Sequence, residues 1–160
     1  MSREIERKFR LAAAPAWLDD HDCEPIEQGY LVSEGERVEV RLRRSGGRAS
    51  LTVKSLGGLN RAEVVLDLEP SQVETLWPLT EGRRITKRRH RVSGERLPVE
   101  VDVYAGGLEG LVVAEVEFGS EAEANRFEPA GWLGREVTGD ERFANRKLAS
   151  DGLPEEEDEQ

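Results

Sequence analysis

The chain has 160 residues and a formal net charge of -10 at pH 7, with 35% charged and 37% hydrophobic residues. This length is typical of a single domain with a substantial buried core. The acidic balance argues against general binding to nucleic acids or anionic membranes, because both are polyanions. Cys23 is the single cysteine, which excludes an intrachain disulfide and a cysteine-based zinc site.

Short segments in which apolar and charged residues alternate predict eight β-strands, since side chains two residues apart on a strand share a face. The segments are separated by Gly, Ser or Pro residues and lie at 4–11, 26–33, 37–44, 49–55, 61–68, 83–92, 98–104 and 111–118. We expect one mainly β domain over residues 1–150. The acidic run at its end predicts a disordered tail at 151–160.

Helices are fewer, and each begins at a recognisable capping pattern. Ser71 with Glu74, Ser120 with Glu123, and Thr138 with Glu141 each have the spacing of a capping box. These patterns predict short helices near 71–77, 120–126 and 139–149. A further helical turn is expected around 15–19.

Charged side chains share one face of the predicted strands, and apolar side chains share the other. The charged face comprises Glu4, Glu6, Lys8, Glu39, Arg41, Arg43, Thr52, Lys54, Arg61, Glu63, Arg83, Ile85, Lys87, Arg89, Glu100, Asp102, Glu115 and Glu117. For any single strand, exposure of this face to solvent is the ordinary interpretation. Arg and Glu recur here with few neutral polar residues between them, which favours a closed barrel with the charged face inward.

The segment at 4–8, Glu-Ile-Glu-Arg-Lys, matches the ExExK signature of the triphosphate tunnel metalloenzymes, also called the CYTH domain family. ExExK alone is common, but further similar stretches follow in order along nearly the whole chain, at 28–31, 41–43, 52–54, 61–63, 85–89, 100–102, 110–117 and 132–138. The chain resembles the small bacterial inorganic triphosphatases of this family. The resemblance implies an eight-stranded antiparallel closed barrel, or tunnel, with short helices outside and a C-terminal helix.

The resemblance implies that the tunnel binds a triphosphate. Binding such a polyanion requires several cations, and the guanidinium fork of Arg matches phosphate oxygens. The expected substrate-binding residues are Lys8, Arg41, Arg43, Lys54, Arg61, Lys87 and Arg89. Lys87 is also expected to protonate or stabilise the leaving phosphate. Two interpretations stay open for Tyr30: it packs a strand, or it places its hydroxyl near the phosphates.

Carboxylates beside a polyanion imply divalent cations, and Mg²⁺ prefers oxygen ligands. By resemblance, the metal-binding acids are Glu4, Glu6, Glu115 and Glu117, and the cofactor is Mg²⁺ or Mn²⁺. Glu63, Glu100 and Asp102 are expected to hold a second ion or the nucleophilic water. The family often has RxExE where this chain has Val65 at the last position, so the number of ions stays open.

The expected function is metal-dependent hydrolysis of the terminal phosphoanhydride of tripolyphosphate, with weaker action on nucleoside triphosphates. Two alternatives stay open: an adenylyl cyclase that makes cyclic AMP and pyrophosphate, and a non-catalytic polyphosphate sensor. We expect a cytoplasmic monomer or homodimer with no nucleic-acid or membrane partner. The final predicted helix either closes a tunnel mouth or packs Phe143 and Leu148 into the core, and the second interpretation is favoured.

Overall fold

The computed structural model describes residues 5–32, 37–56, 62–93 and 96–155. Its strands form one antiparallel sheet in the order β5-β4-β3-β2-β6-β7-β8-β1-β9. The strands are β1 (Ile5–Leu11), β2 (Asp22–Tyr30), β3 (Val38–Ser45), β4 (Arg48–Ser55), β5 (Glu63–Asp67), β6 (Arg84–Val92), β7 (Val99–Tyr104), β8 (Val112–Phe118) and β9 (Arg135–Glu136). All the predicted strands are therefore confirmed, although β2 begins at Asp22 rather than at 26, and β9 was not predicted.

Short helices connect the strands. The α-helices are α1 (Pro70–Leu76), α2 (Glu121–Arg126) and α3 (Asn145–Asp151). The 3-10 helices are η1 (Ala16–Asp20), η2 (Trp77–Thr80), η3 (Gly106–Leu108), η4 (Gly131–Leu133) and η5 (Glu141–Phe143). None of the described helices is long and apolar enough to cross a membrane.

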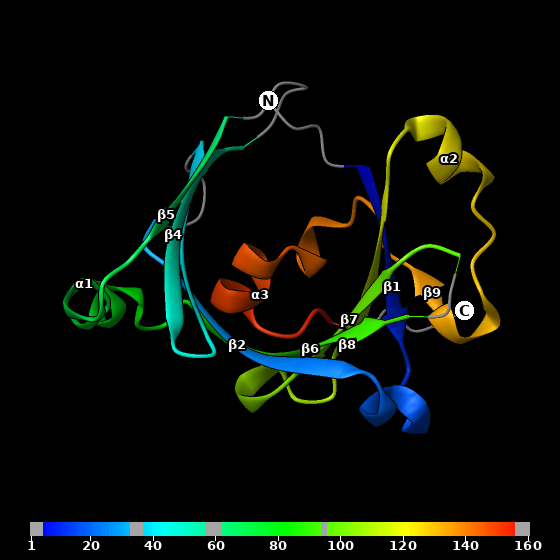
Figure 1. The fold of residues 1–160 in the computed structure, drawn as a ribbon, viewed down its shortest axis with the longest axis horizontal. Helices are drawn as coiled ribbons and strands as arrows, with labels where there is room; N and C mark the ends of the chain where they lie inside the picture. The colour runs from blue at the N-terminus through cyan, green and yellow to red at the C-terminus, as the bar shows by residue number, and fades with distance from the viewer. Residues whose placement is uncertain (1–4, 33–36, 57–61, 94–95, 156–160) are drawn as a thin grey trace.

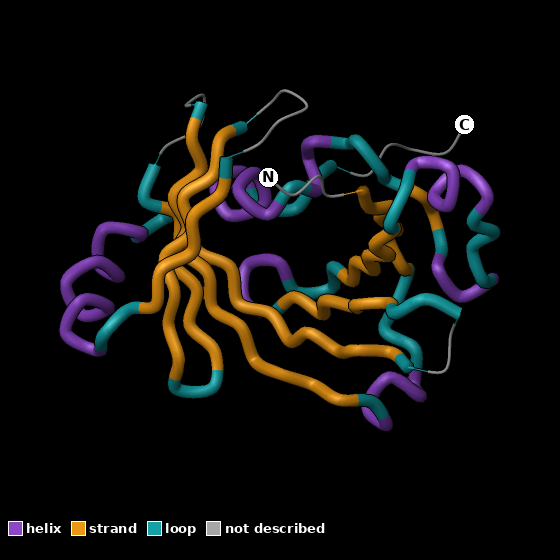
Figure 2. Tube along the Cα trace, turned by 45° about the horizontal axis from the view of Figure 1, so that its top comes forward, coloured by secondary structure: helices purple, strands orange, loops and turns teal. Residues whose placement is uncertain are grey.

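The sheet curves into a trough (Figure 1). The strands β4 and β5 form one arm, β1 and β8 form the other, and β2, β6 and β7 lie between them. The helix α3 lies inside the trough, whereas α1 and α2 lie outside the two arms. Figure 2 shows the same curvature from a second direction, with helical segments beyond both ends of the sheet.

Two apolar clusters cover the two faces of the sheet. The outer cluster includes Phe9, Val101, Ala114 and Val116, which are almost fully buried beneath α2 and η4. The inner cluster joins Tyr30, Ile85, Tyr104, Leu111 and Val113 to Phe143 and Leu148 of the C-terminal segment. The inner cluster fills only part of the trough, so the charged side chains of the same face lie beside it.

The predicted closure of the barrel is not observed among the described residues, and this prediction is corrected to an open, mainly β sheet. The strands β5 and β9 are its two edges. The strand β9 pairs with Phe9 and Arg10 of β1, and so takes part of the edge that a closing strand would need. At the other edge every residue of β5 is exposed.

The predicted capping residues were right for one helix and wrong for another. In α2 the hydroxyl of Ser120 accepts a hydrogen bond from the backbone N–H of Glu123, as predicted. In α1 the capping box is formed by Glu69 and Gln72, not by Ser71 and Glu74. The reason is Pro70, which has no N–H and is well suited to the first helical position, so the helix begins there.

The helix predicted at 139–149 is two shorter helices, η5 and α3, separated by the extended residue Ala144 (ψ 137°). The hydroxyl of Thr138 accepts a hydrogen bond from the backbone N–H of Lys8, and Asp140 caps η5 instead. Phe143 and Leu148 are each 1% exposed, which confirms the packing interpretation of this segment. Residues 156–160 of the predicted tail lie outside the described residues.

Gly29 marks a close approach between β2 and η2. A Cβ atom at this position would lie 2.5 Å from Oγ1 of Thr80, which is fully buried. We therefore expect Gly29→Ala to lower the free energy of unfolding by about 1–3 kcal/mol through overpacking, measured by chemical denaturation. Gly107→Ala is the matched control, because its Cβ would meet open space. Equal stability of the two variants would contradict this prediction.

Candidate functional site

Charged side chains are sorted by sign across the inner face of the sheet. Register places Arg41 and Arg43 of β3, Lys54 of β4, and Lys87 and Arg89 of β6 on this face. It places Glu100 and Asp102 of β7, Glu115 and Glu117 of β8, and Glu6 of β1 on the same face. The arm with Arg41, Arg43 and Lys54 is therefore mostly cationic, and the arm of β1 and β8 is mostly acidic. The floor between these arms (Figure 1) carries both signs, with cations on β6 and acids on β7.

The two halves meet at an ion cluster formed by Lys87, Arg89 and Asp102. Asp102 Oδ2 lies 2.8 Å from Lys87 Nζ, and Arg89 donates hydrogen bonds of 2.8 and 3.0 Å to the two carboxylate oxygens. Burial lowers the pKa of the Lys87 ammonium to about 8, although Asp102 opposes this shift. For Asp102, burial alone would raise the pKa, but Lys87 and Arg89 outweigh it and hold the pKa below its usual range.

Burial and pairing give this cluster a clear chemical character. Lys87 is fully buried, and it is a cation whose charge is balanced by one buried carboxylate. Arg89 is also paired with Glu100, at 2.9 Å between Nε and Oε2. Since both oxygens of Asp102 contact cations, the structure shows it holding Lys87 and Arg89 in place. Its predicted metal-binding role stays a prediction.

A hydrogen-bonded chain joins Arg43, Gln28 and Tyr30 on the neighbouring strands. Arg43 donates to Gln28 Oε1 from Nε (3.1 Å) and Nη2 (2.8 Å), and Gln28 Nε2 donates to the Tyr30 hydroxyl at 3.1 Å. Burial, assisted by Glu39, raises the pKa of Tyr30 to about 12, so its phenol stays neutral. Tyr30 packs in the inner cluster, which confirms the first of the two interpretations left open by the sequence. Its hydroxyl is hydrogen-bonded to Gln28, and the placement of that hydroxyl near the phosphates stays a prediction.

The acidic half offers carboxylates that suit a hard divalent cation. Glu6 and Glu117 are directly opposite each other in the β1–β8 ladder, an arrangement that is unfavourable for two like charges unless a cation lies between them. Glu115 is 3.4 Å from Lys8 Nζ, which also donates to the carbonyl oxygen of Phe143 at 3.3 Å. Within the described ranges, no three His, Cys, Asp or Glu side chains form a metal-holding group.

A pair of carboxylates still fits a magnesium-like ion, because such ions commonly take one or two carboxylates and complete their shell with water and substrate phosphate. Glu4, the first acid of ExExK, and the predicted cation Arg61 both lie outside the described residues. Glu63 is on the inner face opposite Lys54, but it is exposed at the free edge. Val65, opposite Thr52, leaves the next position of that edge without a carboxylate.

Three polar side chains of the site were not among the predicted site residues: Gln28, Tyr104 and Asn145. The Tyr104 hydroxyl donates to Asn145 Oδ1 at 2.6 Å, and Lys87 Nζ donates to the same oxygen at 3.5 Å. Gln28 is two residues before Tyr30 and shares its strand face, so the alternation of side chains along β2 could have identified Gln28 as a candidate site residue. No sequence pattern places Asn145 beside Lys87, because α3 reaches the inner face only through tertiary packing.

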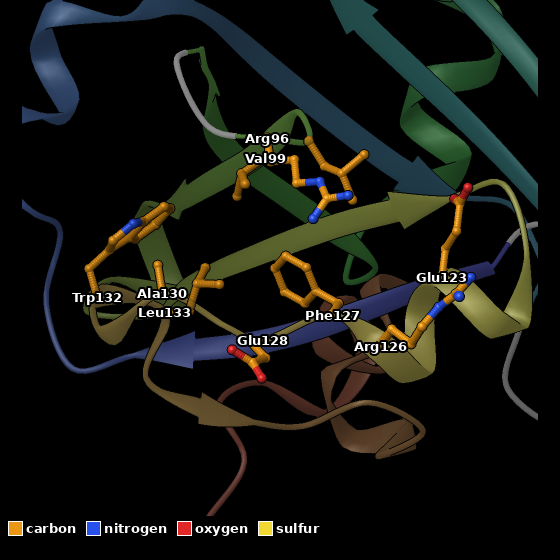
Figure 3. Close-up of a pocket in the computed structure, with 10 residues that line it drawn as sticks. Arg96, Val99, Glu123, Arg126, Phe127, Glu128, Ala130, Trp132 and Leu133 are labelled. Atoms are coloured by element: carbon orange, nitrogen blue, oxygen red, sulfur yellow. The ribbon is translucent and has the colours of Figure 1, made fainter.

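A separate cavity of about 620 Å³ lies on the outer face, between the sheet and the segment that follows α2 (Figure 3). Phe127, Trp132 and Leu133 line it together with Arg96 and Arg126. Its floor belongs to the outer apolar cluster, and none of the predicted site residues lines it. The charge and hydrogen-bond chemistry described above is therefore confined to the inner face.

A curved antiparallel sheet that gathers Arg, Lys and carboxylates on its inner face has the features of a protein that binds a polyanionic ligand. The family model described as "CYTH domain" matches residues 2–142 of the chain. The protein belongs to the CYTH domain family, which confirms the resemblance inferred from its motifs.

Similar proteins of known name support this membership. The chain is 45% identical over 150 residues to an inorganic triphosphatase of Nitrosomonas europaea, covering 91% of this chain and 96% of the relative. It is 35% identical over 150 residues to an inorganic triphosphatase of Acetivibrio thermocellus, covering 92% and 94%. The crystal structure of the inorganic triphosphatase NE1496 superposes with a TM-score of 0.75 at 40% identity, covering 97% of this chain and 99% of that one.

Proposed function

We propose that this protein is a divalent-metal-dependent triphosphatase that hydrolyses the terminal phosphoanhydride of inorganic tripolyphosphate. The observation that carries the proposal is the gathering of charge on one inner face, where Lys87 is fully buried beside Asp102 and the carboxylates of Glu6 and Glu117 are directly opposite each other. The similarity to proteins named inorganic triphosphatase, at 45% and 35% identity, supports the same reaction class.

The phosphate chain would lie along the cationic half of the trough. Arg41, Arg43 and Lys54 form one wall, and Arg89 and Lys87 lie on its floor. Arginine provides paired N–H donors for phosphate oxygens, and partial burial strengthens such contacts because water is excluded. We assign Lys8, held by Glu115 on the opposite arm, to the other side of the same ligand.

The metal would be held by the facing acids Glu6 and Glu117, with Glu4 and Glu115 as further ligands. The family's triphosphatases are generally dependent on divalent metal ions, and Mg²⁺ or Mn²⁺ suits carboxylate oxygens. Bound there, the ion supplies neutralisation of phosphate charge in the transition state.

The protein's own groups would position the reacting atoms and move one proton. Water attacks the terminal phosphorus in line, the bond to the bridging oxygen breaks, and orthophosphate and pyrophosphate leave. Glu63, Glu100 and Asp102 were predicted to hold a second ion or the nucleophilic water. Glu100 is the best placed of them to accept the proton of the water, because it adjoins Arg89 and its side chain is 42% exposed. Lys87 Nζ is assigned to the leaving oxygen, which it stabilises by charge or by donating a proton.

One assay tests this function against its two rivals. The protein is incubated with Mg²⁺ or Mn²⁺ and either tripolyphosphate or ATP, and orthophosphate, pyrophosphate and cyclic AMP are measured. Equal release of orthophosphate and pyrophosphate from tripolyphosphate, dependent on metal, is the expected result. Cyclic AMP with pyrophosphate from ATP would indicate a cyclase instead. Tight binding of tripolyphosphate without turnover would indicate a sensor.

The lowered pKa of Lys87 predicts how activity depends on pH. Below about pH 8 the buried ammonium is charged and can bind phosphate, and above this pH it becomes neutral in the folded protein. We therefore expect kcat/KM for tripolyphosphate to fall as pH rises through about 8 to 9, measured at constant ionic strength and saturating metal.

The same titration acts in the opposite direction on stability. Between the folded pKa of about 8 and the ordinary value of 10.5, the unfolded chain binds a proton that folded Lys87 has lost. The contribution of Lys87 to the free energy of unfolding therefore rises with pH across this window.

The activity prediction has a clear contradicting outcome. A profile of kcat/KM that stays flat up to pH ~10 would contradict the assignment of a charged Lys87 to the reaction.

A further inference from the structure

Glu39 of β3 is a buried carboxylate within the cationic half of the trough. Register pairs it with Lys54 on β4, and the next inward-facing residue of its own strand is Arg41. Only 7% of its surface is exposed. A negative charge at this place repels a polyanionic ligand, so its presence on the phosphate-binding wall requires a physical explanation.

The contacts of Glu39 suggest that explanation. Its Oε2 atom lies 3.4 Å from Lys54 Nζ and 3.8 Å from Arg41 Nη1, so one carboxylate oxygen adjoins two cations of the wall. This oxygen is buried and has no hydrogen-bond partner among the described residues, and the same is true of Arg41 Nε. The attraction is therefore mainly coulombic, and Glu39 does not occupy the N–H donors of Arg41 and Lys54 with hydrogen bonds.

Crowding of positive charge explains what such a contact would achieve. Arg41, Arg43 and Lys54 lie on two adjacent strands, and without a nearby anion they would repel one another towards solvent. The crowding also shows in Arg43, whose pKa is lowered to about 10 by burial and then by Arg41. An anion placed between Arg41 and Lys54 opposes this repulsion before any ligand arrives.

We propose that Glu39 is a positioning residue that holds Arg41 and Lys54 converged on the wall of the trough, ready for a triphosphate. The proposal rests on the proposed function, and it concerns substrate affinity and not the chemical step. Glu39 contacts neither the predicted metal-binding acids nor Lys87 in the described structure. Its loss should therefore weaken ground-state and transition-state binding alike, which raises KM with little change in kcat.

The test variant is Glu39→Gln, which keeps the size of the side chain and removes its charge. We expect KM for tripolyphosphate to rise by about tenfold while kcat stays within about threefold of wild type. Glu39→Asp keeps the charge, and we expect it to restore at least part of the lost affinity. Glu27→Gln is the matched control, because Glu27 pairs with Arg44 (2.5 Å) on the same sheet but on its outer face, and its KM should not change.

The direction of the change in KM tests the positioning role of Glu39. An unchanged or lower KM for Glu39→Gln would overturn the proposal, because Glu39 would then act only as a repulsive charge. A parallel fall of kcat, affinity and unfolding midpoint in Glu39→Gln, without recovery in Glu39→Asp, would also overturn it by indicating a general structural role.

Binding measured without turnover separates this proposal from the proposed function. Calorimetric titration with tripolyphosphate in the absence of divalent metal gives the Kd of wild type and variants. If wild type binds but does not hydrolyse tripolyphosphate, the proposed function fails, and a tenfold weaker Kd for Glu39→Gln would still support the positioning role. If wild type does not bind tripolyphosphate at all, both are overturned.

Discussion

Replacing Glu117 by alanine is expected to abolish phosphate release from tripolyphosphate while leaving the fold intact. Glu117 is exposed on the inner face and lies opposite Glu6, so its removal leaves only one of the two facing carboxylates. The kcat at saturating substrate should fall by a factor of about 10²–10³ or more, since the metal then neutralises the transition state poorly. The measurement is orthophosphate release over a range of Mg²⁺ and Mn²⁺ concentrations.

Stability and a matched acid serve as controls for this variant. The unfolding free energy of Glu117→Ala should lie within about 0.5 kcal/mol of wild type, because an exposed side chain is removed. Glu128→Ala removes an exposed carboxylate beside the cavity of the outer face and should keep full activity (Figure 3). A Glu117→Ala protein that remains active and responds to metal would refute the assignment.

Asp102→Ala is expected to lower the free energy of unfolding by about 3–5 kcal/mol, the usual cost of leaving a buried charge without its partner. Asp102 contacts Lys87 at 2.8 Å and receives two hydrogen bonds from Arg89, and Lys87 has no exposed side-chain surface. Chemical denaturation near pH 7 measures the effect. Activity should also fall, because Lys87 and Arg89 lose the group that orients them.

A second substitution tests whether the uncompensated charge is the cause. Lys87→Met in the Asp102→Ala background removes the buried ammonium, and it should recover a substantial part of the lost stability, with a coupling of about 0.5–3 kcal/mol. Asp140→Asn is the control, because it keeps a capping side chain for η5 and removes the charge of an exposed ion pair with Arg142 (2.6 Å), which should contribute less than about 1 kcal/mol. A loss below about 1 kcal/mol for Asp102→Ala would contradict the prediction.

Alternation along the chain was enough to predict most of the sheet. In β7, Val99 and Val101 point to the outer core, and Glu100 and Asp102 point to the inner face, as period two requires. The family motifs added the prediction of which charged positions share one site. Such patterns succeed because the direction of a side chain on a strand is decided locally, by the backbone of that strand.

Helix starts were harder to predict because several residues compete to cap the same turn. The side chains of Ser71 and Thr138 matched the capping pattern. However, Pro70 makes α1 begin one residue before Ser71, and the hydroxyl of Thr138 accepts a hydrogen bond from the backbone of β1. The break at Ala144 is a related case, since it lets Phe143 and Leu148 both reach the inner cluster. Packing thus outweighed a local preference of about 1 kcal/mol.

The sequence by itself determined the strands, the faces of their side chains, the family, and most of the candidate charged residues. Only the tertiary structure decided that the sheet is an open trough among the described residues, that Asn145 meets Lys87 and Tyr104, and that Asp102 holds two cations. It also decided that Glu39 is buried between Arg41 and Lys54. The physical reason is that alternation is a local property, whereas curvature, closure and burial depend on pairing between strands distant in the chain and on where α3 packs.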